Sequence, residues 1–289
     1  MSDITRVGVI GAGLMGSGIA EVCARAGLDV IVREIDDAAA SSGRARMEGS
    51  LSRAVKAGKI SALEREAALE RITVTTELGD LADRDLVIEA ATENPDIKAM
   101  IFAELDRVVK RPDAILATNT SSIPIVAVAR ATARPAQVVG LHFFNPAPVQ
   151  QLVELIPSLL TSEETAERAR GFATDVLGKT AITAPDQSGF VVNALLVPYL
   201  LAAIRMLEAG HATAVDIDTG MTLGCAHPMG PLKLADLIGL DTVEAVAGSL
   251  YEEFQEPLYA APPLLRRMTA AGLLGRKSGR GFYDYQEGR

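Results

Sequence analysis

The stretch Thr5–Gly16, TRVGVIGAGLMG, decides the fold of this chain. It begins with the β-branched, apolar run Thr5–Ile10, which predicts a buried strand. This run leads directly into the glycines of a GxGxxG motif, Gly11, Gly13 and Gly16, and then into a segment with helical spacing. A strand, this loop and a helix in succession form the setting in which the motif binds a dinucleotide. We therefore predict an α/β fold with a Rossmann-type, doubly wound sheet.

Each glycine of the motif meets a different physical demand. Gly11 permits a tight turn, Gly13 lets the backbone approach a pyrophosphate, and Gly16 allows the helix to pack closely on the strand. Leu14 and Met15 lie at the start of the helix, where free amides and the helix dipole attract an anion. The strand and helix on either side of the loop disfavour an ordinary glycine-rich turn.

An acidic residue follows the second predicted strand, Leu28–Arg33. Glu34 has the place of the carboxylate that binds the ribose 2′-hydroxyl in such folds. A carboxylate there repels a 2′-phosphate, which favours NAD over NADP. Arg33 leaves NADP open, because its guanidinium could hold that phosphate.

A long charged segment, Asp36–Leu69, follows. Gly58 and Lys59 divide it into two predicted helices, and Ser61 is placed to cap the second. The segment is longer than an ordinary crossover helix, so we expect a helical hairpin that projects from the domain. Its basic residues form either a solvated face or a site for a phosphorylated substrate tail. They are Arg44, Arg46, Arg53, Lys56 and Lys59.

Polar side chains follow two further predicted strands, Asp85–Ala90 and Ala114–Thr118. Glu93 comes after the first strand, and Asn119 and Ser121 come after the second. The carboxyl ends of parallel strands share one edge of a sheet, and ligands bind there.

Helix capping is the alternative role for these polar residues. Ser121 or Ser122 could cap the predicted helix Ile123–Ala129. Pro95 is suited to the first turn of the helix that follows Glu93.

A histidine ends the apolar run of Val138–Pro148, VVGLHFFNPAP. His142 therefore lies at a strand end, before a turn that contains Asn145. The next predicted strand, Gln151–Ile156, carries Glu154 among apolar residues. A buried carboxylate needs a partner, and His142 is the natural one. In the alternative, the backbone caps the histidine and the glutamate points outward.

The pattern changes after the last predicted strand, Thr180–Thr183. We expect a dinucleotide-binding domain over 1–184, a linker over 185–189, and a helical substrate and dimerisation domain over 190–289. Asn193 lies in the first turn of that domain's first helix. The predicted helices are Phe190–Ala209, Ala214–Leu223, Pro231–Asp236, Asp241–Phe254 and Leu264–Ala271.

The composition excludes several classes of protein. A net charge of −9 and a pI of about 5.0 disfavour nucleic acid and anionic membranes as partners. The longest apolar run, Phe190–Ile204, is shorter than the roughly 20 residues of a membrane-spanning helix. The two cysteines, the start of the chain and the histidine spacing indicate no disulfide framework, no signal peptide and no metal site. We expect a cytoplasmic protein.

A dinucleotide site, a strand-end histidine and a buried glutamate together indicate hydride transfer coupled to proton transfer. His142 is suited to remove the hydroxyl proton, while Glu154 holds the ring and stabilises the imidazolium. The nicotinamide would accept the hydride.

Eight segments, in order along nearly the whole chain, resemble the short-chain (3S)-3-hydroxyacyl-CoA dehydrogenase family. Within it they are most similar to bacterial enzymes acting on 3-hydroxybutyryl-CoA. The segments are GAGLMGSGIA, IEAATEN, ATNTSSI, GLHFFNPAP, QLVELI, SGFVVN, AHPMGPLKLADLIGLD and GLLGRKSGRGFYDY.

The resemblance implies reversible oxidation of a short-chain 3-hydroxyacyl-CoA with NAD, by a homodimer joined through the helical domain. It implies a catalytic group of His142, Glu154, Ser121, Asn193 and Asn145. It implies cofactor contacts from Gly11, Gly13, Leu14, Met15, Gly16, Glu34, Glu93, Lys98 and Asn119. It implies contacts to the CoA substrate from Ser121, Ser50, Lys56 and Lys59.

Two positions depart from the family pattern. Glu34 stands where the family usually has aspartate, and Ser188 stands where it commonly has proline. Two other functions stay open at this point. The protein could oxidise a free hydroxy acid or sugar acid, or it could bind a nucleotide without catalysis.

Overall fold

The computed structural model describes residues 3–285. The chain divides between Asp186 and Gln187 into two compact units, called unit 1 and unit 2 in chain order.

Unit 1 is built on a sheet of eight strands in the order β3-β2-β1-β4-β5-β6-β7-β8, within the part of the chain that the structure describes. Strands β1 to β6 are parallel, β7 is antiparallel to β6, and β8 is parallel to β7. The strands are β1 Arg6–Ile10, β2 Asp29–Arg33, β3 Ile72–Thr75, β4 Leu86–Glu89, β5 Ile115–Thr118, β6 Val138–Phe143, β7 Leu152–Pro157 and β8 Thr180–Thr183. Each predicted strand is present, and the doubly wound α/β fold is confirmed.

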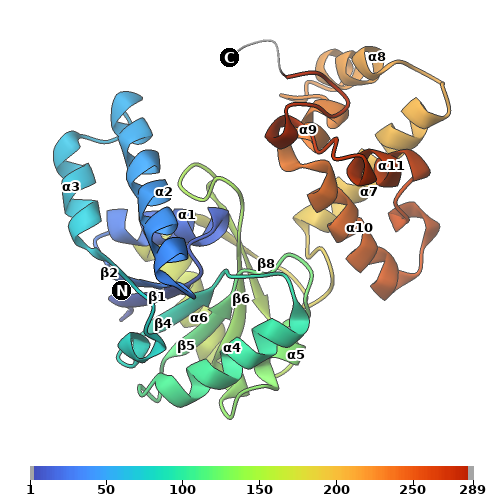
Figure 1. Ribbon diagram of the computed structural model, residues 1–289. Helices are drawn as coiled ribbons and strands as arrows, with labels where there is room; N and C mark the ends of the chain where they lie inside the picture. Colours follow the sequence, from blue (N-terminus) through green and yellow to red (C-terminus); the bar gives the residue numbers. More distant parts are fainter. Residues whose placement is uncertain (1–2, 286–289) are drawn as a thin grey trace. The chain divides into compact units, whose positions relative to one another are not determined.

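Helices cover both faces of this sheet (Figure 1). Helices α4 and α5 pack together on one face, while α1 and α6 contribute to the core on the other. The helices of unit 1 are α1 Leu14–Arg25, α2 Asp37–Lys56, α3 Ala62–Glu70, α4 Pro95–Val108, α5 Ile125–Ala129 and α6 Glu163–Gly171. Short 3-10 turns are η1 Leu78–Leu81 and η2 Pro135–Gln137, and the π-helical turn η3, Phe172–Val176, continues α6.

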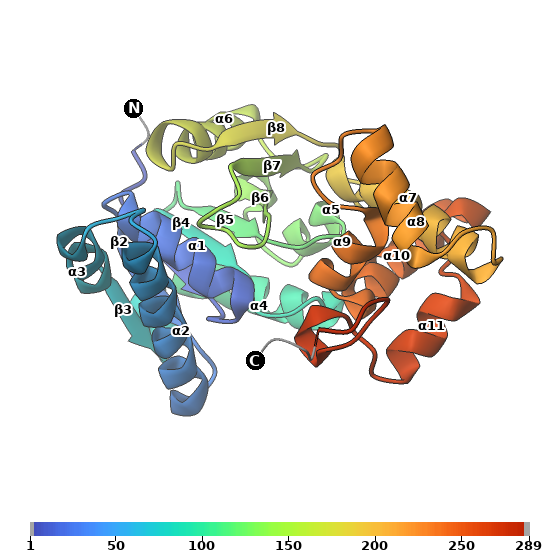
Figure 2. The same cartoon turned by 90° about the horizontal axis from the view of Figure 1, so that it is seen from above.

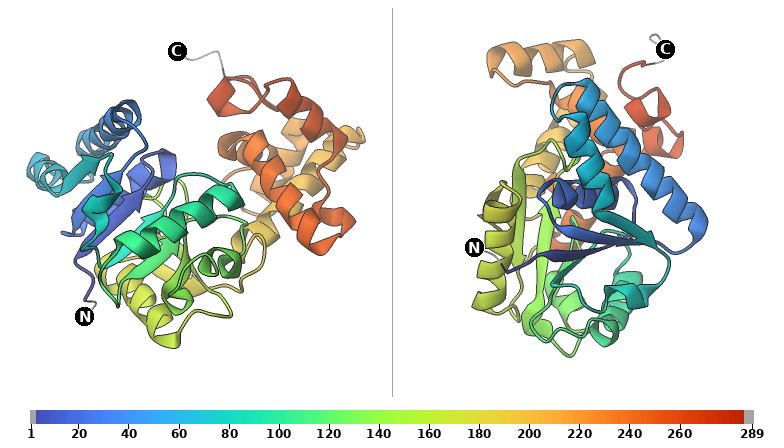
Figure 3. Two further views of the ribbon diagram at one scale, coloured as in Figure 1. Left: turned by 60° about the horizontal axis from the view of Figure 1, so that its bottom comes forward. Right: turned by 90° about the vertical axis from the view of Figure 1, so that its left-hand side faces the viewer.

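Helices α2 and α3 form the predicted hairpin (Figures 1 and 3). Asp36 caps α2 by accepting from the Ala39 amide at 2.8 Å. Ser61 and Glu64 form a capping box at the start of α3, so the cap predicted at Ser61 is confirmed. Most of α2 is solvated because the helix buries few of its residues, namely Gly43, Met47 and Leu51.

The alternative role considered for Ser121 and Ser122, capping of the next helix, is not found at α5. Neither Ser121 nor Ser122 caps the helix, which begins after Pro124 without a side-chain cap from that residue. The Asp186 carboxylate instead accepts hydrogen bonds from the Ile125 and Val126 amides, at 2.6 and 2.8 Å. An acid distant in sequence supplies the cap, and local pattern reading has no means of finding it.

Unit 2 is helical (Figure 2). Its helices are α7 Val192–Glu208, α8 Ala214–Thr219, α9 Pro231–Ile238, α10 Leu240–Phe254 and α11 Pro263–Ala270. It also contains a π-helical turn, η4 Gly220–Gly224, and two short 3-10 turns, η5 Pro257–Tyr259 and η6 Arg276–Ser278. All five predicted helices are present, and their apolar faces enclose one core.

Two buried carboxylates hold the end of the described chain: Asp236 accepts from the Phe282 and Tyr283 amides, and Asp218 accepts from the Tyr283 hydroxyl. Over residues 3–285, no helix is long and apolar enough to cross a membrane.

Candidate active site

Strands β6 and β7 bring a histidine and a glutamate face to face. His142 and Glu154 are paired residues in the antiparallel register, so their side chains leave the sheet on the same face. The His142 Nδ1 and Glu154 Oε2 atoms are 2.7 Å apart, and the two residues are 5% and 0% exposed. The expected contact is therefore present. The contact is made through Nδ1, and the second ring nitrogen is Nε2.

A serine hydroxyl lies beside that second nitrogen. Ser121 Oγ is 3.4 Å from His142 Nε2. Glu93 fixes the serine's backbone, because its carboxylate accepts from the Ser121 amide and from the Thr120 hydroxyl, each at 2.7 Å. The Phe144 ring packs against the imidazole with centroids 4.6 Å apart. The loop after β5 is thus held in place around the histidine.

The three asparagines predicted at the site lie in different places. The Asn119 side-chain oxygen accepts from the Phe143 amide at 2.8 Å, so Asn119 fixes the backbone next to His142. Asn145 is exposed and precedes a cis peptide bond to Pro146. Asn193 lies in the first turn of α7, in unit 2.

The glycine-rich loop has the shape that a pyrophosphate requires. A side chain at Gly16 would meet the Gly11 carbonyl oxygen at 1.8 Å, so only glycine permits this packing. Gly11 adopts φ +89° and lies tightly against Ala91. In front of Gly13 no atom lies within 4 Å of where a Cβ would stand, which leaves the space a ligand needs. The residues present fit a dinucleotide.

Glu34 lies at the edge of this loop, as predicted. One carboxylate oxygen accepts from the Ala12 amide, and the other accepts from the Ile35 amide at 3.1 Å. The Arg33 guanidinium donates to the Thr76 carbonyl at 3.3 Å, and the Arg46 guanidinium of the hairpin donates to the Ala12 carbonyl at 2.5 Å. Charged side chains therefore bind both the amide and the carbonyl group of Ala12.

Lys98 was predicted to contact the cofactor, but the structure buries its side chain. It is 1% exposed, and its ammonium pairs with Glu89 and donates to the Thr118 hydroxyl at 3.2 Å. It also lies 3.8 Å from the Glu93 carboxylate. The sequence analysis did not identify Glu89 and Thr118 as site residues. Each is the last residue of a strand at the ligand-binding edge of the sheet, and this position could have identified them.

The hairpin residues proposed for CoA do not share one face of α2. Ser50 and Lys56 are separated by about 120° around a helix of 3.6 residues per turn. Ser50 is half-buried and Lys56 is exposed. Arg53, one of the basic residues predicted as a possible site for a phosphorylated substrate tail, is by contrast about one turn from Ser50 and on the same side.

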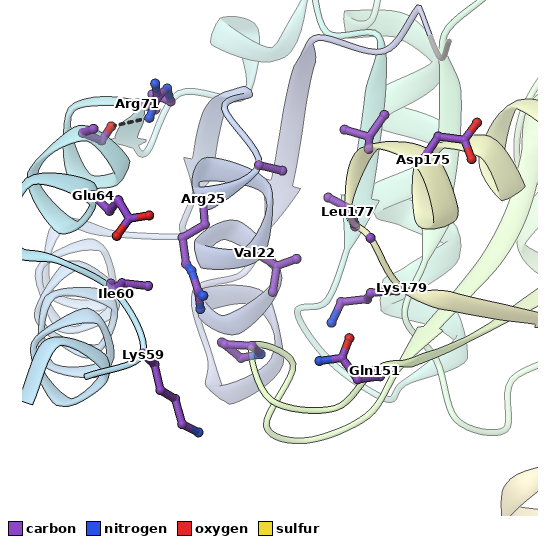
Figure 4. Close-up of a pocket in the computed structure, with 15 residues that line it drawn as sticks. Val22, Arg25, Lys59, Ile60, Glu64, Arg71, Gln151, Asp175, Leu177 and Lys179 are labelled. Atoms are coloured by element: carbon purple, nitrogen blue, oxygen red, sulfur yellow. Dashed lines mark hydrogen bonds between the residues drawn. The ribbon is translucent and has the colours of Figure 1, made fainter. Parts of the chain in front are cut away.

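Lys59 follows the end of α2 and lines a hollow of about 580 Å³ (Figure 4). The hollow lies between α1, α3 and the segment that leads into β8. Basic side chains prevail in its lining, which contains Arg25, Lys59, Arg71 and Lys179 with Glu64 and Asp175. Arg25 is 3.5 Å from the buried Glu21.

Unit 2 has an apolar hollow of about 590 Å³ beside α7. Leu195, Tyr199 and His227 are among its lining residues, and the Tyr199 hydroxyl is 3.1 Å from His227 Nδ1. Across residues 3–285, no group of three or more histidine, cysteine, aspartate or glutamate side chains is arranged to hold a metal ion.

The glycine-rich loop follows β1, and His142 is the penultimate residue of β6, so both lie at the carboxyl edge of the parallel strands. A dinucleotide loop beside a buried histidine–carboxylate pair defines a nicotinamide-dependent dehydrogenase. Residues 6–187 match the model of the NAD-binding domain of 3-hydroxyacyl-CoA dehydrogenase, and residues 189–285 match that of its C-terminal domain. The chain belongs to the 3-hydroxyacyl-CoA dehydrogenase family, whose cofactor is NAD.

Known relatives extend over the whole chain. A 3-hydroxybutyryl-CoA dehydrogenase of Mycobacterium tuberculosis is 60% identical over 99% of this chain and 100% of its own length. The crystal structure of FadB2 from the same species has a TM-score of 0.97 at 60% identity, covering 98% of this chain and 99% of that chain. That of (S)-3-hydroxybutyryl-CoA dehydrogenase from Ralstonia eutropha has a TM-score of 0.92 at 47% identity, covering 99% of this chain and 100% of that chain.

Proposed function

We propose that this enzyme oxidises (3S)-3-hydroxybutyryl-CoA to the 3-oxoacyl-CoA with NAD, and catalyses the reverse reduction. The observation that carries the proposal is the buried His142–Glu154 pair with the Ser121 hydroxyl at the outer ring nitrogen. The 3-hydroxybutyryl-CoA dehydrogenases of M. tuberculosis and R. eutropha support the choice of substrate.

His142 is the general base. Its Nε2 atom removes the proton of the substrate hydroxyl as the carbon–hydrogen bond breaks. NAD supplies the hydride acceptor when it is bound. Glu154 accepts a hydrogen bond from Nδ1–H and stabilises the imidazolium that forms. In the reduction, the protonated His142 returns the proton to the oxo oxygen.

Polar side chains hold the reacting oxygen. Ser121 donates its hydroxyl to that oxygen, and Glu93 keeps the serine in place through the backbone contact at 2.7 Å. Asn193 donates from the first turn of α7, and Asn145 assists beside His142. These donors stabilise the charge that develops on oxygen during proton transfer.

The cofactor lies along the glycine-rich loop. Leu14 and Met15 begin α1, and Glu34 binds the adenosine ribose through the carboxylate that now accepts from the Ala12 amide. Glu93 and Asn119 would hold the nicotinamide end of NAD, and Lys98 would support them through its contact with Glu93.

The phosphorylated end of the substrate lies against the hairpin. Ser50, Lys56 and Lys59 are the residues for that contact. Because Ser50 and Lys56 lie on different sides of α2, they contact different groups of the CoA.

Assembly and location complete the proposal. The dinucleotide-binding domain spans 1–184, and the helical domain, 190–289, joins two copies of the chain in a cytoplasmic homodimer. The apolar hollow of unit 2 and exposed leucines there, Leu195 at 72% and Leu223 at 82%, support this assembly. Light scattering after size-exclusion chromatography tests it, and a monomer at micromolar concentration would contradict it.

Oxidation of NADH at 340 nm, monitored with acetoacetyl-CoA, tests the function. We expect turnover with acetoacetyl-CoA, little with free acetoacetate, and a preference for NADH over NADPH. Turnover confined to the free acid would identify a hydroxy-acid dehydrogenase, and NADH binding without any turnover would identify a non-catalytic nucleotide-binding protein.

A further inference from the structure

The loop 144–151 joins the two strands of the catalytic pair. It leaves β6 just after His142, and it enters β7 just before Glu154. It also carries Asn145. Any shift of this loop therefore acts on both members of the pair.

A buried lysine holds the middle of this loop. Lys179 precedes β8 and is 7% exposed. Its ammonium donates to the carbonyl oxygens of Ala147 at 2.9 Å and Gln150 at 2.7 Å. Figure 4 shows the Lys179 side chain extending from the β8 side beside Gln151, the loop's last residue. Burial lowers the pKa of Lys179, and the nearby charge of Arg25 lowers it further, while Cys23 opposes the change.

Other contacts show why the lysine matters to this loop. Pro146 accepts from the Val149 and Gln150 amides, which closes the turn on itself. The Gln151 carbonyl accepts from the Thr180 amide at 2.8 Å. On the opposite side, a Cβ at Gly18 of α1 would stand 3.2 Å from the Ala147 Cβ, so the loop rests directly on the helix. Lys179 is the side chain that ties this closed turn to β8.

We propose that Lys179 is a positioning residue of the dehydrogenase, which acts by holding the loop 144–151 against α1 and β8. The charged ammonium donates to two carbonyl groups of a partly buried turn, and removing it takes a charged donor from both. With the loop held, the ends of β6 and β7 keep His142 and Glu154 opposed. The proposal rests on the proposed function, in which His142 is the base.

The test compares Lys179→Met and Lys179→Gln with Lys179→Arg. We expect Lys179→Met to lower kcat for acetoacetyl-CoA reduction by about tenfold or more, because small misplacements of catalytic groups are costly. The Kd for NADH should stay within about twofold, since the glycine-rich loop is untouched. Lys179→Gln keeps one donor and should fall between the wild type and Lys179→Met. Lys179→Arg keeps the charge and the donors, so we expect it to recover most of kcat.

Lys110→Met is the matched control. Lys110 also donates to a backbone carbonyl, that of Arg107 at 2.7 Å, but on the exposed end of α4. Its kcat should equal that of the wild type. Equal kcat for Lys179→Met and Lys110→Met would overturn the proposal, as would a Lys179→Arg variant no faster than Lys179→Met.

Hydrogen–deuterium exchange gives a readout that does not depend on turnover. A peptide covering 144–151 should exchange faster in Lys179→Met and Lys179→Gln than in the wild type and Lys110→Met. If exchange were unchanged in both Lys179 variants, Lys179 would not hold the loop 144–151, and this conclusion would stand even if the wild type proved inactive. A wild type without turnover would instead refute the proposed function, and the two failures are thus distinct.

Discussion

At the scale of single residues, the site depends on which groups can be buried together. A carboxylate that is 0% exposed is costly unless it has a partner. Glu154 has His142, and Glu89 has Lys98. The first pair contains the residue that we propose as the base, and the second lies 3.8 Å from the Glu93 carboxylate through Lys98. The same physical requirement thus explains the burial of both pairs.

Replacing His142, the proposed base, should lower the rate of turnover and leave the affinity for NADH unchanged. We expect His142→Ala to lower kcat by roughly 10²- to 10⁴-fold, which is the usual contribution of a general base. The glycine-rich loop lies on another strand, so fluorescence titration should give an unchanged Kd for NADH. Wild-type turnover in this variant would refute the assignment of His142.

The glutamate should contribute through its charge. Glu154→Gln retains the size of the side chain and can still accept from Nδ1–H, but it cannot offset the charge of the imidazolium. We expect kcat to fall by about 10- to 100-fold, because a buried charge-assisted hydrogen bond is replaced by a neutral one. Steady-state kinetics with saturating NADH measure this, and Glu163→Gln, on the exposed first turn of α6, is the control. An equal loss of rate in both variants would remove Glu154 from the pair.

At the scale of elements, short helices depend on caps that come from elsewhere in the chain. Helix α5 has five residues and follows the loop that carries Ser121. The Asp186 carboxylate is its cap, and Asp186 is also the last residue of unit 1. The cap therefore ties the end of the unit to the loop of the candidate site.

Removing this cap should destabilise unit 1. We expect Asp186→Ala to lower the free energy of unfolding by about 1–2 kcal/mol, because two amides at a helix start lose their acceptor. Urea unfolding followed by circular dichroism measures the change. Asp37→Ala, an exposed acid in the first turn of α2, should change stability by less than about 0.5 kcal/mol. A smaller effect at Asp186 than at Asp37 would contradict the capping role.

At the scale of the whole molecule, a buried acid at the amino edge of the sheet joins β1 to β4. Asp85 is 2% exposed. Burial raises its pKa, but the hydrogen bonds from the Thr5 and Arg6 amides and the Thr5 hydroxyl, together with the charge of Arg111, outweigh this effect. The pKa of Asp85 therefore lies below its ordinary value of 3.8.

This shift sets the sign of a pH dependence. The folded state favours the ionised form, so its stabilisation is present above the unfolded pKa and is lost as pH falls through the folded pKa. We expect Asp85→Asn to cost about 2 kcal/mol at pH 7, where charged hydrogen bonds are lost. The difference from the wild type should shrink below pH about 3.8. Urea midpoints at pH 7, 5 and 3 measure it, and an equal difference at all three would contradict this account.

Local signals were sufficient for most of the fold. Apolar runs marked the strands, and capping residues such as Ser61 marked helix starts, because both depend on neighbours in the chain. Signals that depend on distant residues were missed. They include the Asp186 cap of α5, the burial of Lys98 beside Glu89, and the tie from Lys179 to the loop 144–151.

The sequence by itself determined the dinucleotide loop, the order of strands and helices, and the choice of His142 and Glu154 as partners. The glycines of the loop are required by local backbone geometry, which their order in the chain specifies. Only the tertiary structure decided how the partners meet. Strand β7 runs antiparallel to β6, so the register places Glu154 opposite His142, and Ser121 reaches the other ring nitrogen from a different strand end. Register is specified where a strand face is buried, and which strand ends come together depends on how the whole sheet assembles.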